Sequence, residues 1–137
     1  LIMKRKTALK LNLKPLATIR SHSSFSHQPK WFTTAPKHAI EKNLAQENLT
    51  PSDIDLFEIN EAFAVVNCAV QSQLNIPNHK VNVHGGAIAL GHPIGATGSR
   101  LITTLIHALQ HYNMSLGCAS LCIGGGEACS MIIQSNS

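Results

Sequence analysis

Apolar positions recur along the chain with two spacings, and this pattern predicts strands that alternate with helices. Short apolar runs bounded by turn residues predict strands at residues 16–19, 56–59 and 80–84. Two further apolar runs, residues 116–123 and 128–133, flank three consecutive glycines and predict an antiparallel hairpin. Strands in this order, with helices between them, predict an α/β domain in which helices cover a mixed sheet.

Four helices are predicted before and between these strands. The first is a short basic helix at residues 4–12, and the second begins at Pro36 and ends near Asn48. The third, residues 62–74, is apolar nearly all round, which predicts a central helix buried between two layers, with Asn60 as its cap. The fourth follows Gly98 and carries one apolar stripe, which comprises Leu101, Ile102, Leu105, Ile106 and Leu109.

Two connecting segments contain the residues of loops and turns. Serine and histidine dominate residues 21–30, which we expect to form a loop. Thr50 and Asp53 flank Pro51 and predict a short capped turn before the second strand.

The composition of the 137 residues, 44% hydrophobic and 13% charged, is that of one globular domain. A chain of this length buries roughly two-thirds of the surface that its unfolded form exposes, so it needs no metal or disulfide to fold. The composition excludes a disordered tail, a collagen-like repeat and a disulfide-stapled miniprotein.

Positive charge is concentrated near the beginning of the chain. Eleven Lys and Arg against seven Asp and Glu give a net charge of +4, and nine of the eleven precede residue 43. Clustered cations bind phosphates, but this segment lacks the interleaved aromatic residues and the groove-reading motifs of nucleic-acid-binding modules. We therefore expect a solvated surface and no nucleic-acid partner.

Apolar runs and cysteine spacing bear on the compartment. No apolar run approaches the roughly 20 residues that span a bilayer, so no membrane partner is expected. The cysteines lie in apolar stretches without the spacing of a disulfide framework, which favours a reducing compartment and a cytoplasmic location. The chain opens on Leu1 rather than on Met, so we expect its true start to lie upstream.

Three loops carry the residues that are capable of chemistry, and each lies where a predicted strand ends. They contain Asn60, His92 and Cys122. Strand ends are where α/β sheets bind ligands. Pro93 disfavours the helical conformation at His92 and so holds the imidazole on extended backbone. The structural alternatives are a turn histidine that is bonded to a carbonyl, and a cysteine that serves as a small core hydrophobe.

The glycines and cysteines do not complete a phosphate or metal site. The glycines from Gly91 to Gly98 precede Ser and Arg rather than the Lys of a P-loop, and residues 124–126 lack the spacing of a dinucleotide fingerprint. Cys118 and Cys122 lie within one predicted strand, without the short knuckle of a structural zinc site. We expect neither a nucleotide cofactor nor a metal.

Three motifs together resemble the signatures of the thiolase family in order and spacing. They are Asn60-Glu61-Ala62-Phe63, Gly91-His92-Pro93 within residues 82–95, and Cys122-Ile123-Gly124-Gly125-Gly126. Residues 14–137 are similar to the C-terminal domain of that family, and residues 1–13 resemble the tail of a missing N-terminal domain. The isoleucine after Gly-His-Pro resembles the branch that condenses two acetyl-CoA molecules to acetoacetyl-CoA.

The resemblance implies a role for each matching residue. His92 activates the cysteine that accepts the acyl group and binds the thioester oxygen. Asn60 holds a water in the same oxyanion hole. Cys122 is the acid/base for the carbon of the second acyl group, a role that suits a thiol whose pKa is lowered by a nearby histidine or helix N-terminus. The backbone N–H of Gly124 completes a second oxyanion hole.

The resemblance also implies substrates and partners. Acetyl-CoA and acetoacetyl-CoA are the substrates, in lipid and fatty acid metabolism, and no separate cofactor is needed. Ala62 and Phe63 lie beside the pantetheine arm of CoA. The nucleophilic cysteine of the family belongs to an N-terminal half that these residues do not include, so we expect the chain alone to be an inactive fragment. With that half, a homo-oligomer, dimer or tetramer, is expected.

Departures from the family pattern leave a second hypothesis open. His84 stands where the family usually has Asn, and Glu127-Ala128 stands where a small residue and Gly are common. The alternative is a catalytically inactive thiolase remnant, or a module that keeps only docking and dimerisation surfaces.

Overall fold

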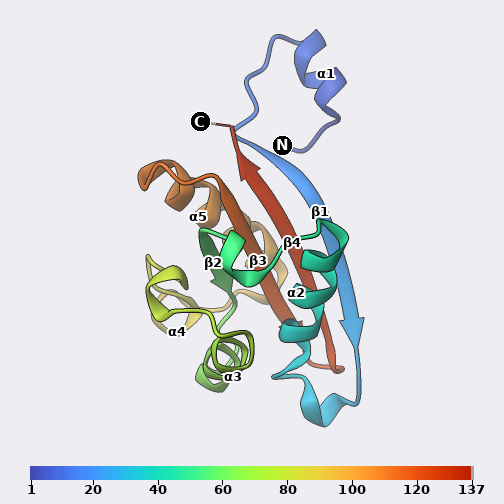
Figure 1. Ribbon diagram of the computed structural model, residues 1–137, viewed down its shortest axis with the longest axis vertical. Coiled ribbons are helices and arrows are strands. Elements are labelled where there is room, and N and C mark those ends of the chain that lie inside the picture. Colours follow the sequence, from blue (N-terminus) through green and yellow to red (C-terminus); the bar gives the residue numbers. More distant parts are fainter. Residues whose placement is uncertain (137) are drawn as a thin grey trace.

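The computed structural model describes residues 1–136 and places helices on both faces of one four-stranded sheet (Figure 1). The strand order is β1 (Ala17–Ser26), β4 (Glu127–Ser135), β3 (Leu116–Ile123) and β2 (Leu56–Ile59). β4 pairs antiparallel with both β1 and β3, whereas β2 pairs parallel with β3. The predicted α/β class, mixed sheet and hairpin are confirmed.

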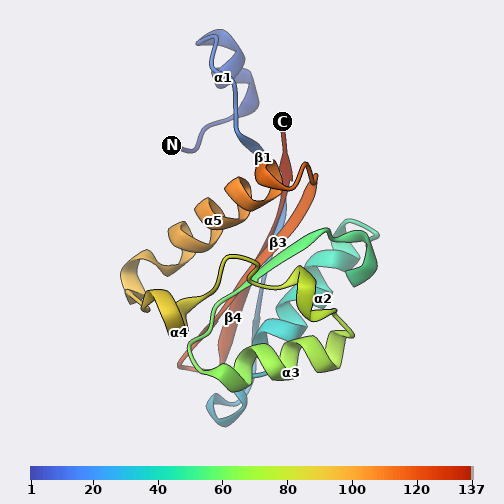
Figure 2. The same ribbon diagram turned by 90° about the vertical axis from the view of Figure 1, so that its left-hand side faces the viewer.

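The alternation of side chains along the strands supplies two apolar layers. Phe57 and Ile59 of β2 pack with α2 (Ala35–Gln46) and α3 (Ala64–Leu74) on one face. Leu56 points to the other face, where it packs against α5 (Thr97–His111). Figure 2 shows the sheet between α5 and the α2/α3 pair. The stripe predicted for the last helix is the one that α5 buries.

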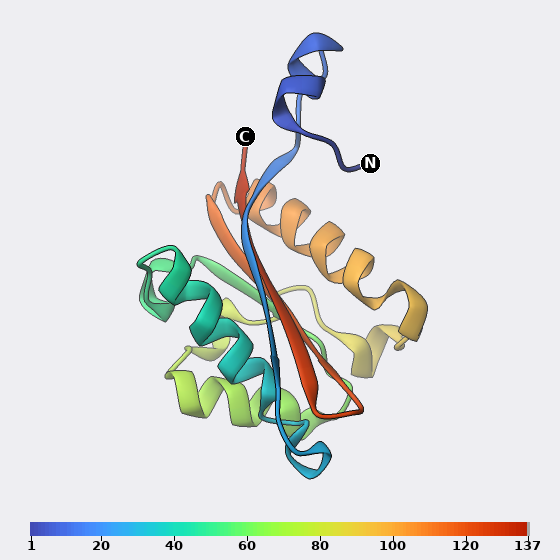
Figure 3. The same cartoon turned by 90° about the vertical axis from the view of Figure 1, so that its right-hand side faces the viewer.

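Shorter elements connect this framework. They are α1 (Arg5–Lys10), the 3-10 turns Pro29–Trp31, Pro51–Asp53, Asn78–Lys80 and Ile94–Ala96, and α4 (Ala87–Leu90). The capped turn after Thr50 is confirmed, because the Thr50 N–H donates to Asp53 Oδ2 at 2.7 Å. Figure 3 shows α1 standing apart from the body of the domain. Among the helices of residues 1–136, none has the length and apolar character needed to cross a membrane.

Two strand predictions were wrong. The serine-rich segment predicted as a loop continues β1 to Ser26, because small polar residues suit an edge strand, and Ser23 Oγ donates to the Ala39 carbonyl at 2.6 Å. At residues 80–84 the structure has one bridge, between Phe57 and Val81. Asn82 then turns into the left-handed region, and its side chain replaces the backbone ladder.

The third predicted helix differs in its start and in its burial. α3 begins at Ala64, two residues later than predicted, and its N-cap is Phe63 rather than Asn60. It buries only the face that carries Val66, whereas Val65 is 54% exposed. Within this chain α3 is therefore an outer helix, although its exposed face has the composition of a buried one.

Candidate active site

The parallel pairing of β2 and β3 brings two of the three candidate loops to one edge of the sheet. Ile59 is in register with Ser120, and the Asn60 N–H donates to the Ser120 carbonyl at 2.9 Å. Cys122 follows Ser120 by two residues on β3. Asn60 and Cys122 therefore leave the carboxyl ends of neighbouring parallel strands, as the loop positions predicted.

The third loop joins them through a direct contact between Asn60 and His92. Asn60 Nδ2 lies 3.5 Å from His92 Nε2. The Asn60 side chain is not a helix cap, because it is turned toward this imidazole and is 1% exposed. His92 itself is exposed, so one face of its ring is open to a ligand.

Hydrogen bonds at the other ring nitrogen favour one tautomer of His92. Nδ1 lies 2.8 Å from Thr97 Oγ1, and this hydroxyl donates its proton to the Pro93 carbonyl at 3.2 Å. Since a hydroxyl has a single proton, Thr97 accepts from Nδ1–H. Nε2 then has the lone pair of the ring, which faces the Asn60 amide N–H at 3.5 Å. An exposed imidazole nitrogen with a lone pair is able to accept a proton.

A buried ion pair lies behind Asn60. Arg100 of α5 donates through Nη1 to Glu58 Oε2 at 3.0 Å and through Nη2 to Asn60 Oδ1 at 3.5 Å. Glu58 is 1% exposed, and burial raises the pKa of its carboxyl to about 7, although the Arg100 charge opposes the shift. Neither residue belonged to a predicted site. The sequence feature that could have pointed to this pair is Glu58, a carboxylate within an otherwise apolar strand.

Glu61 ties the loop that carries His92 to the end of β2. Oε1 accepts from Asn67 Nδ2 and Asn82 Nδ2, both at 3.3 Å, and Oε2 accepts from the Ile88 N–H at 3.0 Å. Gly86 permits this approach, since a Cβ there would lie 2.5 Å from the Glu61 carboxyl group. The loop that carries His92 is thus anchored by a carboxylate whose partners were not evident from the sequence.

The remaining candidate residues lie at the surface around this edge. Phe63 is 60% exposed and its ring contacts that of Phe32, with the centroids 5.8 Å apart. Ala62 is half-buried, and Gly124 is exposed in the hairpin turn. The predicted departure at Glu127 does not disrupt the hairpin, because Glu127 is in register with Ile123.

The cysteines differ in their environments. Cys122 is half-buried, and burial raises the pKa of its thiol, opposite to the lowering that we expected. Burial raises the pKa of Cys118 to about 12, whereas Cys129 is exposed. Residues 1–136 contain no cluster of three or more His, Cys, Asp or Glu side chains that could hold a metal ion.

We expect the thiols to be alkylated in an order that follows this geometry. Exposed Cys68 and Cys129 react first, Cys122 reacts only as the pH rises above the ordinary thiol pKa of about 8.5, and Cys118 stays protected in the folded chain. Short iodoacetamide pulses between pH 7 and 10, followed by peptide mass spectrometry, measure each rate. Labelling of Cys122 at pH 7 as fast as that of Cys68 would contradict the raised pKa.

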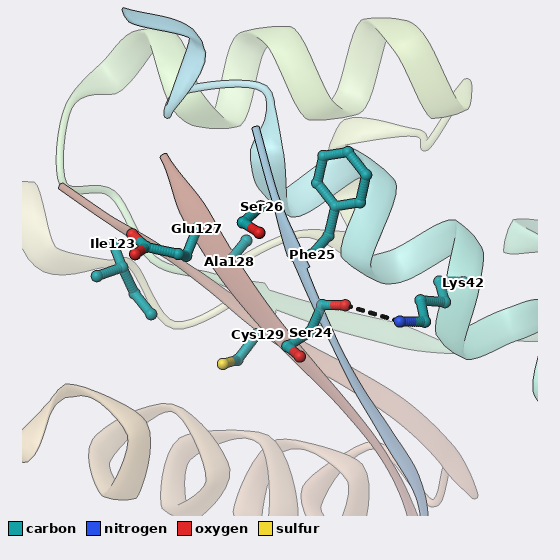
Figure 4. A pocket seen from close by; sticks show the side chains of 8 residues that line it. All are labelled: Ser24, Phe25, Ser26, Lys42, Ile123, Glu127, Ala128 and Cys129. Carbon is teal, nitrogen blue, oxygen red and sulfur yellow. Dashed lines mark hydrogen bonds between the residues drawn. The ribbon is translucent and has the colours of Figure 1, made fainter. Parts of the chain in front are cut away.

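A separate hollow of about 560 Å³ lies beside the hairpin (Figure 4). Lys42 Nζ donates to the Ser24 carbonyl at 3.1 Å at its rim. None of Asn60, His92 and Cys122 lines it. Its lining comes from β1, α2 and the hairpin, and comprises Ser24, Phe25, Ser26, Lys42, Ile123, Glu127, Ala128 and Cys129.

Comparisons with known proteins agree with the motifs and the fold. Residues 13–135 match the family described as thiolase, C-terminal domain. The acetyl-CoA acetyltransferase of Escherichia coli (strain K12) is 48% identical over 133 residues, which are 97% of this chain and 34% of that protein. This chain therefore spans about a third of the length of the curated relatives it matches.

Solved structures give the same result. The Bacillus anthracis acetyl-CoA acetyltransferase has a TM-score of 0.94 at 41% identity, over 97% of this chain and 34% of that one. Human mitochondrial 3-ketoacyl-CoA thiolase, in complex with CoA, has a TM-score of 0.94 at 40% identity, with the same coverage. By motif, sequence and fold, the chain belongs to the thiolase family and corresponds to its C-terminal domain.

Proposed function

We propose that this chain supplies one half of the active site of an acetyl-CoA acetyltransferase, which condenses two acetyl-CoA molecules to acetoacetyl-CoA or runs the reverse thiolysis. The observation that carries the proposal is the orientation of His92. On this exposed ring Nε2 lies 3.5 Å from the Asn60 amide nitrogen, at the end of the sheet where β3 carries Cys122. The nucleophilic cysteine comes from the N-terminal part of the family, and residues 1–13 are the tail of that part.

In the first half-reaction His92 acts as the base. Nε2 accepts the proton of the nucleophilic thiol, and the thiolate forms an S–C bond to the carbonyl carbon of the first acetyl-CoA. The imidazolium Nε2–H and a water held by Asn60 then stabilise the negative oxygen. The bond to CoA breaks, and the CoA thiolate leaves with the proton that His92 held.

In the second half-reaction Cys122, as a thiolate, removes a proton from the methyl carbon of the second acetyl-CoA. The resulting carbon forms a C–C bond to the acyl carbon, the acyl-enzyme C–S bond breaks, and the departing thiolate takes up the proton from Cys122. The backbone N–H of Gly124 stabilises the charge on the second thioester oxygen. Burial raises the pKa of the Cys122 thiol, so its thiolate is a smaller fraction near neutral pH but a stronger base than an ordinary thiolate once it forms.

The exposed apolar residues fit the surface that joins the two parts. Five large apolar side chains are more than half exposed: Phe63 and Val65 at the start of α3, Ile88 and Leu90 on α4, and Ile94 in the turn that follows α4. A soluble domain rarely leaves so many large apolar side chains together unless they are an interaction surface. We assign this apolar surface to packing against the N-terminal part, with Phe63 and Ala62 reaching the pantetheine arm of CoA.

We expect the 137 residues alone to bind a hydrophobic dye strongly and to self-associate, because the apolar surface is open. Fluorescence of anilinonaphthalene sulfonate and sedimentation velocity measure both effects. Replacing Val65 and Ile88 with serine is expected to reduce dye binding at unchanged helix content. A monodisperse monomer that binds no dye would contradict the assignment.

The activity itself is tested in a chimaera, in which this chain replaces the matching third of the E. coli acetyl-CoA acetyltransferase. The isolated chain is expected to show no cleavage of acetoacetyl-CoA, whereas the chimaera cleaves it, because only the chimaera holds both thiols. Loss of absorbance of magnesium-complexed acetoacetyl-CoA measures the rate. Cleavage by the isolated chain, or a folded chimaera without activity, would contradict the proposal.

A further inference from the structure

The ion pair of Glu58 and Arg100 is not explained by stability. Glu58 is 1% exposed, and its Oε1 has no hydrogen-bond partner among residues 1–136. Burying an ion pair costs desolvation energy, and apolar residues of similar size commonly stabilise a core as well or better. At this position, between β2 and α5, the pair therefore has another use.

That use is visible in the Asn60 amide. An asparagine side chain has two nearly isosteric orientations, which exchange its oxygen and its NH2 group. Arg100 Nη2 has only protons to offer, so it selects the orientation in which Oδ1 faces the guanidinium. The NH2 group then faces His92 Nε2.

The opposite orientation would change the imidazole. Oδ1 would face the Nε2 lone pair and repel it, which favours a proton on Nε2. Thr97 would then have to donate to Nδ1 and lose its bond to the Pro93 carbonyl. The nitrogen that is open to a substrate would no longer be able to accept a proton.

We propose that Arg100, held in place by Glu58, is a positioning residue that fixes the Asn60 amide and thereby keeps Nε2 of His92 unprotonated in the neutral ring. The planar guanidinium suits this task, because one fork reaches the carboxylate and the amide at once. The importance of Nε2 as a base rests on the proposed function, but the orientation can be tested without any acyl transfer.

The test measures how fast the His92 ring is acylated. Diethyl pyrocarbonate acylates imidazole nitrogens that have a free lone pair, and peptide mass spectrometry reads His92 separately from the other seven of the eight histidines. The full chain is treated at micromolar concentration and pH 7.5. Arg100→Gln is expected to lower the rate of His92 acylation about three- to tenfold relative to that of exposed His22, the effect of about one hydrogen bond. The lone pair moves to Nδ1, which Thr97 covers.

Two further variants separate orientation from charge and from damage to the fold. Arg100→Lys keeps a positive charge beside Glu58 but lacks the two guanidinium nitrogens that reach Glu58 and Asn60 together. It is therefore expected to lower the rate of His92 acylation as Arg100→Gln does. Arg20→Gln is the matched control, because Arg20 also bridges an amide and a carboxylate, those of Gln134 and Glu47. This variant is expected to leave the rate of His92 acylation unchanged.

Each outcome decides the proposal independently of thiolase activity. Unfolding would raise the rate of His92 acylation rather than lower it. A lower rate in both Arg100 variants therefore supports the positioning role. An unchanged or higher rate of His92 acylation in Arg100→Lys, with the helix content retained, would overturn the positioning role. An inactive chimaera together with slowed His92 would reject the proposed function and leave this inference standing.

Discussion

Replacing Cys122 with serine in the chimaera is expected to lower the rate of condensation at least roughly 10²- to 10⁴-fold, the range of general acid–base catalysis. Serine preserves the shape of the loop, but its hydroxyl is far too weak an acid to supply a base near neutral pH. Transfer of a labelled acetyl group to the nucleophilic cysteine should survive, because that step uses His92 instead. Acid-stable label on the protein, measured beside the condensation rate, separates the two steps.

His92→Ala is the matched comparison and should impair both steps. In the proposed mechanism the same imidazole activates the nucleophile and stabilises the thioester oxygen, and loss of one oxyanion donor alone costs roughly 10²- to 10³-fold. If Cys122→Ser abolished acetyl transfer while His92→Ala left it intact, the two assignments would be reversed.

Gly126→Ala is expected to have the largest effect on stability. Gly126 has φ +99°, where an L residue is strained, and a Cβ there would collide with the His27 carbonyl oxygen. The neighbouring backbone cannot move freely, because the His27 N–H donates to the Gly126 carbonyl at 3.0 Å. Strain and overpacking together predict a loss of roughly 3 kcal/mol of unfolding free energy, or roughly 10 °C in Tm.

Gly124→Ala in the same hairpin is the control. A Cβ on Gly124 meets no atom within 4 Å, and its φ lies outside the left-handed region, so its Tm should stay near that of the wild type. Thermal unfolding followed by far-UV circular dichroism measures both variants. Equal melting temperatures for the two would show that the hairpin does not depend on the backbone of Gly126.

The elements that the sequence predicted well are those with a continuous apolar run or one apolar stripe. β2, the hairpin and α5 combine regular spacing with flanking glycine or polar residues, and each formed nearly where the pattern placed it. The length of β1 was underestimated because its polar half is an edge strand, in which the buried Ser23 hydroxyl donates to the Ala39 carbonyl of α2. The burial of α3 could not be judged from its own composition, because its outer face is as apolar as a buried face although Val65 is 54% exposed.

The candidate site divides in the same way. Asn60, His92 and Cys122 could be found because recognisable motifs contain them, although His92 follows α4 rather than the strand predicted at residues 80–84. Glu58 and Arg100 could not, because they are 42 residues apart and meet only when α5 packs on β2. Their signal is physical rather than a motif: a charged residue in a buried strand requires a partner, and the sequence does not say which one.

We propose that this chain supplies the part of a thiolase site that removes a proton from the methyl carbon of acetyl-CoA. Deuterium exchange into that methyl group tests this role most directly. In D2O a base that removes a methyl proton returns a solvent deuteron, so exchange reports this step even when condensation is slow. We expect the chimaera to exchange the methyl protons, and Cys122→Ser to lower the exchange rate at least roughly 100-fold. Exchange at the wild-type rate in Cys122→Ser, or no exchange by a folded chimaera, would contradict this role.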